Sequence, residues 1–209
     1  MKSKSEERQH HWKISYLNVS SLYAHGNDVA RDNFLLDSDV FALGETWLHF
    51  ETEINFEGYR GCFANFGPGK GVSTFIRNEL QVSKEPVIIS SEFLSLVKVR
   101  CVEIDMIFVY VSKKCQQNVL VAKLKELISI SEPTIVIGDF NEHYTDTSKL
   151  SKIMQAMDFH QKITESTHDR GNIIDHLYVN NCLMKTDYFV EKNSAYYSDH
   201  DIISIYVPK

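Results

Sequence analysis

Short apolar runs that stop at a polar residue are the feature that most constrains the fold of this chain. The clearest run is "TIVIGDF", residues 134–140, which follows Pro133 and leads into Asn141. Runs of this length, rich in Val, Ile and Phe and bounded by turn residues, are typical of strands buried on both faces. We predict further strands over residues 13–19, 39–45, 70–77, 80–89, 93–101, 102–111, 172–180, 184–191 and 201–207.

Helical periodicity is confined to a few segments between these strands. Residues 117–131 carry an apolar stripe at helical spacing and are closed by Pro133, and residues 147–157 and 25–38 also have helical spacing. Strands therefore outnumber helices. The mixture predicts two sheets packed face to face with helices outside, an α/β or α+β layered sandwich.

Length and composition set the scale of the molecule. With 209 residues, of which 43% are hydrophobic, the chain suits one domain with a substantial core. The first residues are polar and lack the apolar segment of a secretory signal. We predict a disordered leader over residues 1–11 and a single domain over residues 12–209.

Charge and cysteine content narrow the location and the partners. Four scattered cysteines and no secretory signal favour a nuclear or cytoplasmic protein that is not secreted, and no apolar run approaches the ~20 residues of a membrane span. We expect a monomer without a membrane partner. The net charge of −6 lowers the expectation of tight non-specific binding to nucleic acid, unless the basic residues cluster.

Polar side chains suited to metal or phosphate chemistry stand at the ends of several predicted strands. A lone Asn at such a place is usually a turn residue, and a lone Tyr is usually part of the core. A carboxylate inside an apolar run is harder to explain, because burying it without a partner is costly. Because a sandwich gathers strand ends along one rim, we expect these residues to converge: Asn18, Glu45, Tyr110, Asp139, Asn141, Asp175, Asp199 and His200.

Six segments carry a resemblance in the right order: "LNVSSL", "ALGETWL", "FVYV", "IGDFNEH", "IIDHLYVN" and "YSDHDIISI". They resemble the motifs of the endonuclease/exonuclease/phosphatase superfamily, and are most similar to the apurinic-type endonuclease domains of non-LTR (LINE-type) retrotransposons and related mobile elements. The resemblance runs from about Trp12 to the C-terminus. It implies a DNase I-like four-layered α/β sandwich with two mixed β-sheets, and a domain that in mobile elements is fused to a larger enzyme.

The resemblance also implies a divalent metal, Mg²⁺ with Mn²⁺ as a substitute. Glu45 resembles the principal metal ligand, with Asn18 beside it. Asp199 resembles the acid that lies beside the metal and the catalytic histidine. Asp139 resembles the residue that orients or deprotonates the attacking water.

The remaining motif residues resemble groups that hold the phosphate and the DNA. Asn141 resembles a phosphate-binding amide, and Tyr110 a tyrosine that contacts the phosphate or the leaving oxygen. His200 resembles the catalytic histidine at the scissile phosphate, and Asp175 its carboxylate partner. Thr167 matches a threonine that the retrotransposon branch uses on the DNA backbone.

The function predicted on this basis is a metal-dependent DNA endonuclease that leaves 3′-hydroxyl and 5′-phosphate ends. A phosphatase or phosphodiesterase acting on a small or lipid phosphate, and a silent nucleic-acid-binding or adaptor module, remain as alternatives. Two departures from the family pattern affect substrate contacts: Ser20 stands where many relatives have Arg, and the loop "VSKKC" after Tyr110 lacks their Pro. Trp47 and Tyr144 are either stacking residues at the rim or core residues.

Overall fold

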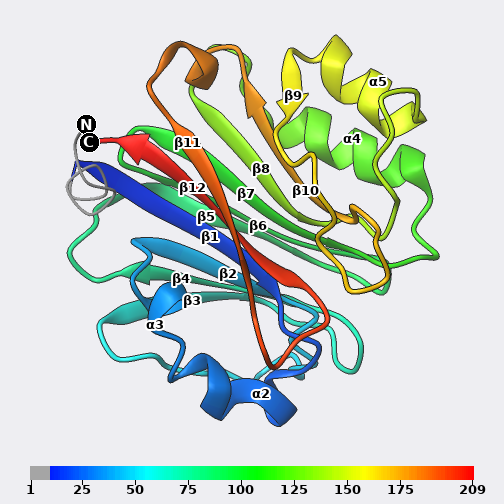
Figure 1. Cartoon of the computed structure of the whole chain (residues 1–209). Helices are drawn as coiled ribbons and strands as arrows, with labels where there is room; N and C mark the ends of the chain where they lie inside the picture. The colour runs from blue at the N-terminus through cyan, green and yellow to red at the C-terminus, as the bar shows by residue number, and fades with distance from the viewer. Residues whose placement is uncertain (1–9) are drawn as a thin grey trace.

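Two six-stranded sheets form the centre of the computed structural model, which describes residues 10–209 (Figure 1). The first sheet has the order β11-β12-β1-β2-β4-β3 and the second the order β5-β6-β7-β8-β10-β9. The strands of the first sheet are β1 (His11–Asn18), β2 (Val40–Gly44), β3 (Tyr59–Ala64), β4 (Val72–Arg77), β11 (Phe189–Ser194) and β12 (Asp201–Pro208). Those of the second are β5 (Val82–Ser90), β6 (Leu94–Cys101), β7 (Ile104–Val111), β8 (Thr134–Asp139), β9 (Phe159–Gln161) and β10 (Asp175–Asn180).

Each sheet is mixed, because it combines antiparallel neighbours with a parallel pair, β1 with β2 and β7 with β8. Parallel neighbours need a crossover connection, usually helical. Helices α2 (Leu22–Val29) and α3 (Asn33–Leu36) lie between β1 and β2, and α4 (Gln117–Leu127) lies between β7 and β8. The predicted helical stretch 25–38 is two short helices, since the Asp32 side chain caps a new helix by accepting from the Leu35 N–H.

The two sheets and the helices on their outer faces form four layers, and three apolar clusters lie between these layers. Alternate strand residues such as Ile14, Tyr16, Ile135 and Ile137 fill the space between the sheets. The opposite face of the first sheet packs against residues of α2 and α3, and that of the second against residues of α4 and α5 (Lys149–Ala156). Figure 1 shows the two helical layers on opposite sides of the molecule. The predicted four-layered sandwich is confirmed.

The structure adds two strands that were not predicted, β3 and β9. β3 is a half-buried edge strand without clear alternation, and β9 has only three residues. A short 3₁₀ helix, Leu183–Lys185, precedes β11. Most of the predicted leader lies outside the described residues, and His11 already belongs to β1. Among the described residues, none of the helices has the length and apolar character needed to cross a membrane.

Candidate active site

The predicted site residues lie at the ends of strands. There the series of alternate apolar residues that face the other sheet stops. Along β8, Ile135 and Ile137 point into the space between the sheets, and Asp139 follows at the same parity. Asn18 occupies the corresponding position at the end of β1, and Asp175 at the start of β10. A polar residue thus replaces the apolar one at the last inner position of β1 and β8 and at the first of β10, which places these side chains along one rim of the sandwich.

Strand register brings three of them into one row across the second sheet. Tyr110 pairs with Asp139 across β7 and β8, and Asp139 pairs with Asp175 across β8 and β10. Both carboxylates are buried, with 1% and 0% of their surface exposed. Burial raises the pKa of Asp139, and the neighbouring Asp175 carboxylate raises it further. The row therefore concentrates negative charge where water is largely excluded.

Asn18 joins this row to the first sheet. Its Nδ2 donates to Asp139 Oδ2 at 2.9 Å and to Glu45 Oε2 at 3.2 Å. Its Oδ1 accepts the Ser20 N–H at 3.0 Å, which defines the orientation of the amide. In this arrangement the side-chain N–H groups of Asn18 face the two carboxylates, and its side-chain oxygen accepts a backbone N–H. The assignment of Asn18 to the metal stays a prediction.

Asp139 is held by the loop that follows it. Its Oδ1 accepts the Asn141 N–H at 2.7 Å, and its Oδ2 accepts from Asn141 Nδ2 at 3.3 Å. Asn141 also donates to the carbonyl of Val111 at 2.8 Å, which ties the loop to the end of β7. The φ of 51° at Asn141 is one that Asn tolerates better than most residues. Asp and Asn two residues apart therefore act as one unit.

His200 and Asp175 form a buried pair. Nδ1 of His200 lies 2.8 Å from Asp175 Oδ2, and the two side chains are 6% and 0% exposed. Burial opposes the charge on His200, but the carboxylates of Asp175, Asp139 and Asp199 outweigh it and raise its pKa to about 9. At neutral pH His200 is therefore an imidazolium whose Nδ1–H donates to Asp175, which leaves Nε2 for another partner.

Thr167 holds the backbone at Asp175 in place through hydrogen bonds. It is fully buried, and its hydroxyl accepts the N–H groups of Ile174 at 3.3 Å and Asp175 at 3.1 Å. Its carbonyl accepts the Asp201 N–H at 2.9 Å. Thr167 thus fixes the start of β10 next to β12. The predicted contact between Thr167 and the DNA backbone stays a prediction.

His168 is a site residue that sequence reasoning missed. Its Nε2 lies 3.3 Å from Asp199 Oδ2, and its ring meets that of His200 edge-on with centroids 4.7 Å apart. Because its Nδ1 accepts the Arg170 N–H at 3.0 Å, Nε2 carries the proton and donates to Asp199. Ser20 also donates to Asp199, at 3.2 Å. The half-exposed Asp199 carboxylate is therefore oriented from two sides.

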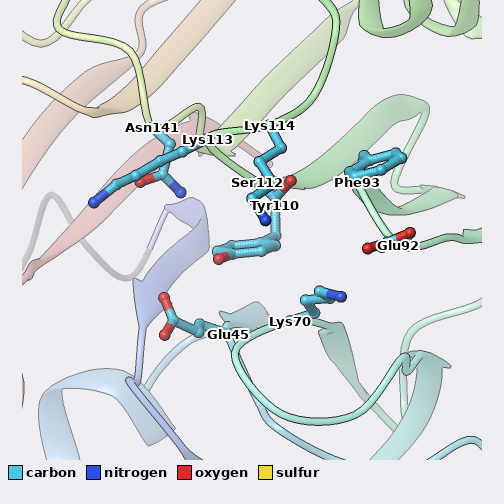
Figure 2. Close-up of a pocket in the computed structure, with 9 residues that line it drawn as sticks. All are labelled: Glu45, Lys70, Glu92, Phe93, Tyr110, Ser112, Lys113, Lys114 and Asn141. Atoms are coloured by element: carbon cyan, nitrogen blue, oxygen red, sulfur yellow. The ribbon is translucent and has the colours of Figure 1, made fainter.

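Glu45 and Tyr110 both line a cavity, in which Figure 2 shows them together with Asn141. The Trp47 indole N–H donates to Glu45 Oε1 at 3.3 Å, and the Tyr110 hydroxyl donates to the carbonyl of Gly69 at 2.8 Å. Burial, together with the charges of Glu45 and Asp139, raises the pKa of Tyr110 well above its ordinary value of 10. Tyr110 therefore remains a neutral hydrogen-bond donor.

A glycine precedes both Glu45, which follows β2, and Asp139, which ends β8. A Cβ on Gly138 would lie 1.9 Å from the carbonyl oxygen of Val109, and one on Gly44 would lie 1.9 Å from the hydroxyl of Tyr16. The Gly-Glu and Gly-Asp pairs in the sequence thus reflect close packing directly beneath the site. Non-glycine residues with positive φ also gather in the loops here: Ser20, Ser21, Glu45, Trp47 and Asn141.

The side chains present fit a divalent metal. Two clusters each bring three side chains to within 4.8 Å of one another, Asp139–Asp175–His200 and His168–Asp199–His200, and because His200 is protonated in this state, the carboxylates are the ligands that they offer. The carboxylates of Glu45 and Asp139 share the Asn18 amide donor, and the charge of Asp175 makes ionisation of Asp139 costly. A cation would relieve this excess of negative charge, and carboxylate oxygens are the ligands that Mg²⁺ and Mn²⁺ prefer.

Comparison with known proteins agrees with this arrangement. The model of the Endonuclease/Exonuclease/phosphatase family matches residues 9–200. A search of curated proteins found no match.

Three solved structures are similar over nearly their full length. An AP endonuclease from Archaeoglobus fulgidus has a TM-score of 0.73 at 15% identity, covering 93% of this chain and 98% of that chain. The endonuclease domain of TRAS1, a telomere-specific non-LTR retrotransposon, has a TM-score of 0.70 at 12% identity, covering 95% and 98%. A 3′-5′ exonuclease from Neisseria meningitidis has a TM-score of 0.71 at 16% identity, covering 94% and 100%. At these identities the likeness concerns the fold.

Proposed function

The chain belongs to the endonuclease/exonuclease/phosphatase family, and on that premise we propose that it is a divalent-metal-dependent DNA endonuclease. Members of this family are metal-dependent hydrolases of phosphodiesters or phosphates. The proposed reaction nicks one strand and leaves 3′-hydroxyl and 5′-phosphate ends. The observation that carries the proposal is the hydrogen-bonded link from Glu45 through Asn18 to Asp139, which stands beside the buried Asp175–His200 pair.

Asp139 is the group suited to hold and deprotonate the attacking water. The hydrogen bonds from Asn18 and Asn141 fix the direction of its carboxylate, so no reorientation is needed during reaction. Its raised pKa brings its proton affinity closer to that required of a general base near neutral pH.

His200 is the group suited to stabilise the phosphoryl oxygens. Asp175 holds its Nδ1 and keeps the ring charged, so that Nε2 offers a proton to an anionic oxygen. Asn141 and the neutral hydroxyl of Tyr110 lie on the neighbouring wall, where they now donate to the carbonyls of Val111 and Gly69 and would exchange these bonds for bonds to the substrate. The resemblance assigns them to the phosphate and the leaving oxygen.

Glu45 and Asp199 are the residues that would hold the metal, with Asn18 beside them. When bound there, Mg²⁺ or Mn²⁺ would supply Lewis-acid stabilisation of the phosphate charge. Glu45 is oriented for this by Trp47 and Asn18, and Asp199 by His168 and Ser20.

We propose DNA as the substrate because the similar structures include two endonucleases and a 3′ phosphatase from Neisseria that is bound to a product DNA hairpin. On the same basis we propose an origin in a mobile element or a domesticated relative. Fusion to a larger enzyme, a monomeric state and a nuclear or cytoplasmic location belong to the same proposal.

Nicking of supercoiled plasmid tests the proposal. We expect nicking with Mg²⁺ that EDTA abolishes, and a loss of at least 100-fold in both His200→Ala and Asp139→Ala. His160→Ala is a matched control, because His160 bonds Asn181 on the distant side of the second sheet. A folded protein that does not nick DNA but releases phosphate from small phosphomonoesters would move the function to the phosphatase alternative.

A further inference from the structure

A cavity of about 330 Å³ extends outward from the site, beyond the residues that the resemblance assigns. Glu45, Tyr110 and Asn141 form its inner part (Figure 2). Its outer wall comes from Lys70 before β4, the turn between β5 and β6, and the segment after β7. This volume is at the lower end of the roughly 300–1,000 Å³ found for small-ligand sites.

Hydrogen bonds hold the outer wall in place. The β5–β6 turn is closed by Ser91, whose hydroxyl accepts the Leu94 N–H at 3.1 Å. The Ser112 N–H donates to the carbonyl of Phe93 at 2.9 Å, which joins this turn to the end of β7. The cavity is therefore formed before any ligand arrives, so a ligand does not have to order it.

Three lysines make the cavity suited to an anion. Lys70, Lys113 and Lys114 all line it, and within residues 10–209 none of them forms an ion pair. The chain as a whole has a net charge of −6, whereas the charge contributed by these three side chains is positive. Glu92 lies on the outer wall and Glu45 faces the proposed metal. Unpaired ammonium groups around a cavity attract a phosphate.

The same wall offers an apolar face and a hydroxyl. The Phe93 ring is 40% exposed at the tip of the turn and lines the cavity. The Ser112 hydroxyl oxygen is buried and has no hydrogen-bond partner among the described residues. An exposed ring, a free hydroxyl and several cations together match the base and the phosphate of one nucleotide.

We propose that this cavity binds one unpaired nucleotide of a nucleic-acid strand next to the scissile phosphate. Its base stacks on Phe93, and its phosphate lies near Lys113, Lys114 and Lys70. The inference rests on the proposed function, because it places the nucleotide beside the reacting phosphodiester. In a duplex both faces of a base are stacked and its edge is paired, so entry costs unstacking. The enzyme should therefore prefer single-stranded or frayed sites to continuous duplex.

Binding measured in EDTA separates this inference from catalysis. We would titrate the full chain against a labelled oligothymidylate, the same strand in a duplex, and free thymidine monophosphate as competitor. Wild-type protein should bind the single strand more tightly than the duplex. Phe93→Ala should weaken single-strand binding by roughly 5- to 100-fold. Lys113→Ala/Lys114→Ala should lower the salt dependence of log K by about 1.4, or about 0.7 for each lysine.

Matched controls come from the helical layer over the second sheet. Val119→Ala on α4 removes an exposed apolar side chain, and Lys149→Ala/Lys152→Ala on α5 removes two exposed lysines. Both should bind as wild type does. If the wild type nicks plasmid but Phe93→Ala keeps its affinity and strand preference, the inference fails while the proposed function stands. A free nucleotide that binds more tightly than the oligonucleotide would also overturn it, in favour of a small-molecule ligand.

Discussion

Replacing Asp175 by Asn should change how the stability of the protein depends on pH. Asn keeps the shape of the side chain and can still accept the His200 Nδ1–H, but it removes the charge that faces the imidazolium at 2.8 Å. The pKa of His200 should therefore fall from about 9 towards the ordinary value of 6.5. Asp139 and Asp199 also raise this pKa, so the fall should be large but incomplete.

The size of the effect follows from that pKa. The difference between a pKa of about 9 and one of 6.5 corresponds to roughly 3.5 kcal/mol of stability, since a shift of one pKa unit is worth about 1.4 kcal/mol. A histidine whose folded pKa is raised contributes its full stabilisation below the unfolded pKa. That contribution is lost as the pH rises through the folded pKa. The cost of Asp175→Asn should therefore be about 2–3 kcal/mol at pH 6 and clearly smaller at pH 9.5.

Urea unfolding of the metal-free protein in EDTA at pH 6, 7.5 and 9.5 measures this cost. Asp201→Asn is the matched control, because Asp201 pairs with Lys192 at 2.9 Å instead of with a histidine. Lysine side chains ordinarily stay protonated to about pH 10, so the cost of the control should vary little over this range. A cost for Asp175→Asn that is equal at pH 6 and pH 9.5 would refute the charged pair.

Three further predictions concern packing, a buried histidine and the metal. Gly138→Ala should cost about 3 kcal/mol or more in urea unfolding, because its Cβ would meet backbone, whereas Gly26→Ala, with open space around it, should change stability by no more than about 1 kcal/mol. NMR titration should show His176 neutral down to about pH 4, because burial lowers its pKa to that value. The shift corresponds to stabilisation on the order of 3 kcal/mol, which is present above pH 6.5 and is lost as the pH falls towards 4. Titration of His176 near the ordinary value of 6.5 would contradict this prediction. Mg²⁺ at 100 times its Kd should raise the free energy of unfolding by about 2.7 kcal/mol, and Glu45→Gln should greatly reduce this gain; an unchanged gain would remove Glu45 from the metal site.

The strands that carry the site could be predicted because their inner residues are buried and β-branched. In "TIVIGDF" the apolar run predicts the strand, and Asp139 has the parity of Ile135 and Ile137, so it points to the same side as these two residues. The helices were predictable for a related reason, since α4 and α5 keep an apolar stripe towards the second sheet.

Strand partners and some site residues could not be predicted, because they depend on contacts far apart in sequence. Nothing local indicates that β4 and β5, which are neighbours along the chain, lie in different sheets. His168 reaches the site through an isolated bridge to His200, and no periodicity marks it. Of the three lysines of the cavity, Lys113 and Lys114 are adjacent in one loop, but only the fold brings Lys70 from another loop beside them.

The central place of β1 in the first sheet has a consequence for folding. One edge of β1 pairs with β2, which follows soon afterwards, but the other pairs with β12, over residues 201–208. Until β12 has been synthesised, β1 exposes an open row of backbone hydrogen-bonding groups, and the core lacks Ile203 and Ile205. Closure of the first sheet therefore has to wait for residues 201–208 and is slow, because its contacts are non-local. The site is likewise incomplete until then, because His200 immediately precedes the closing strand.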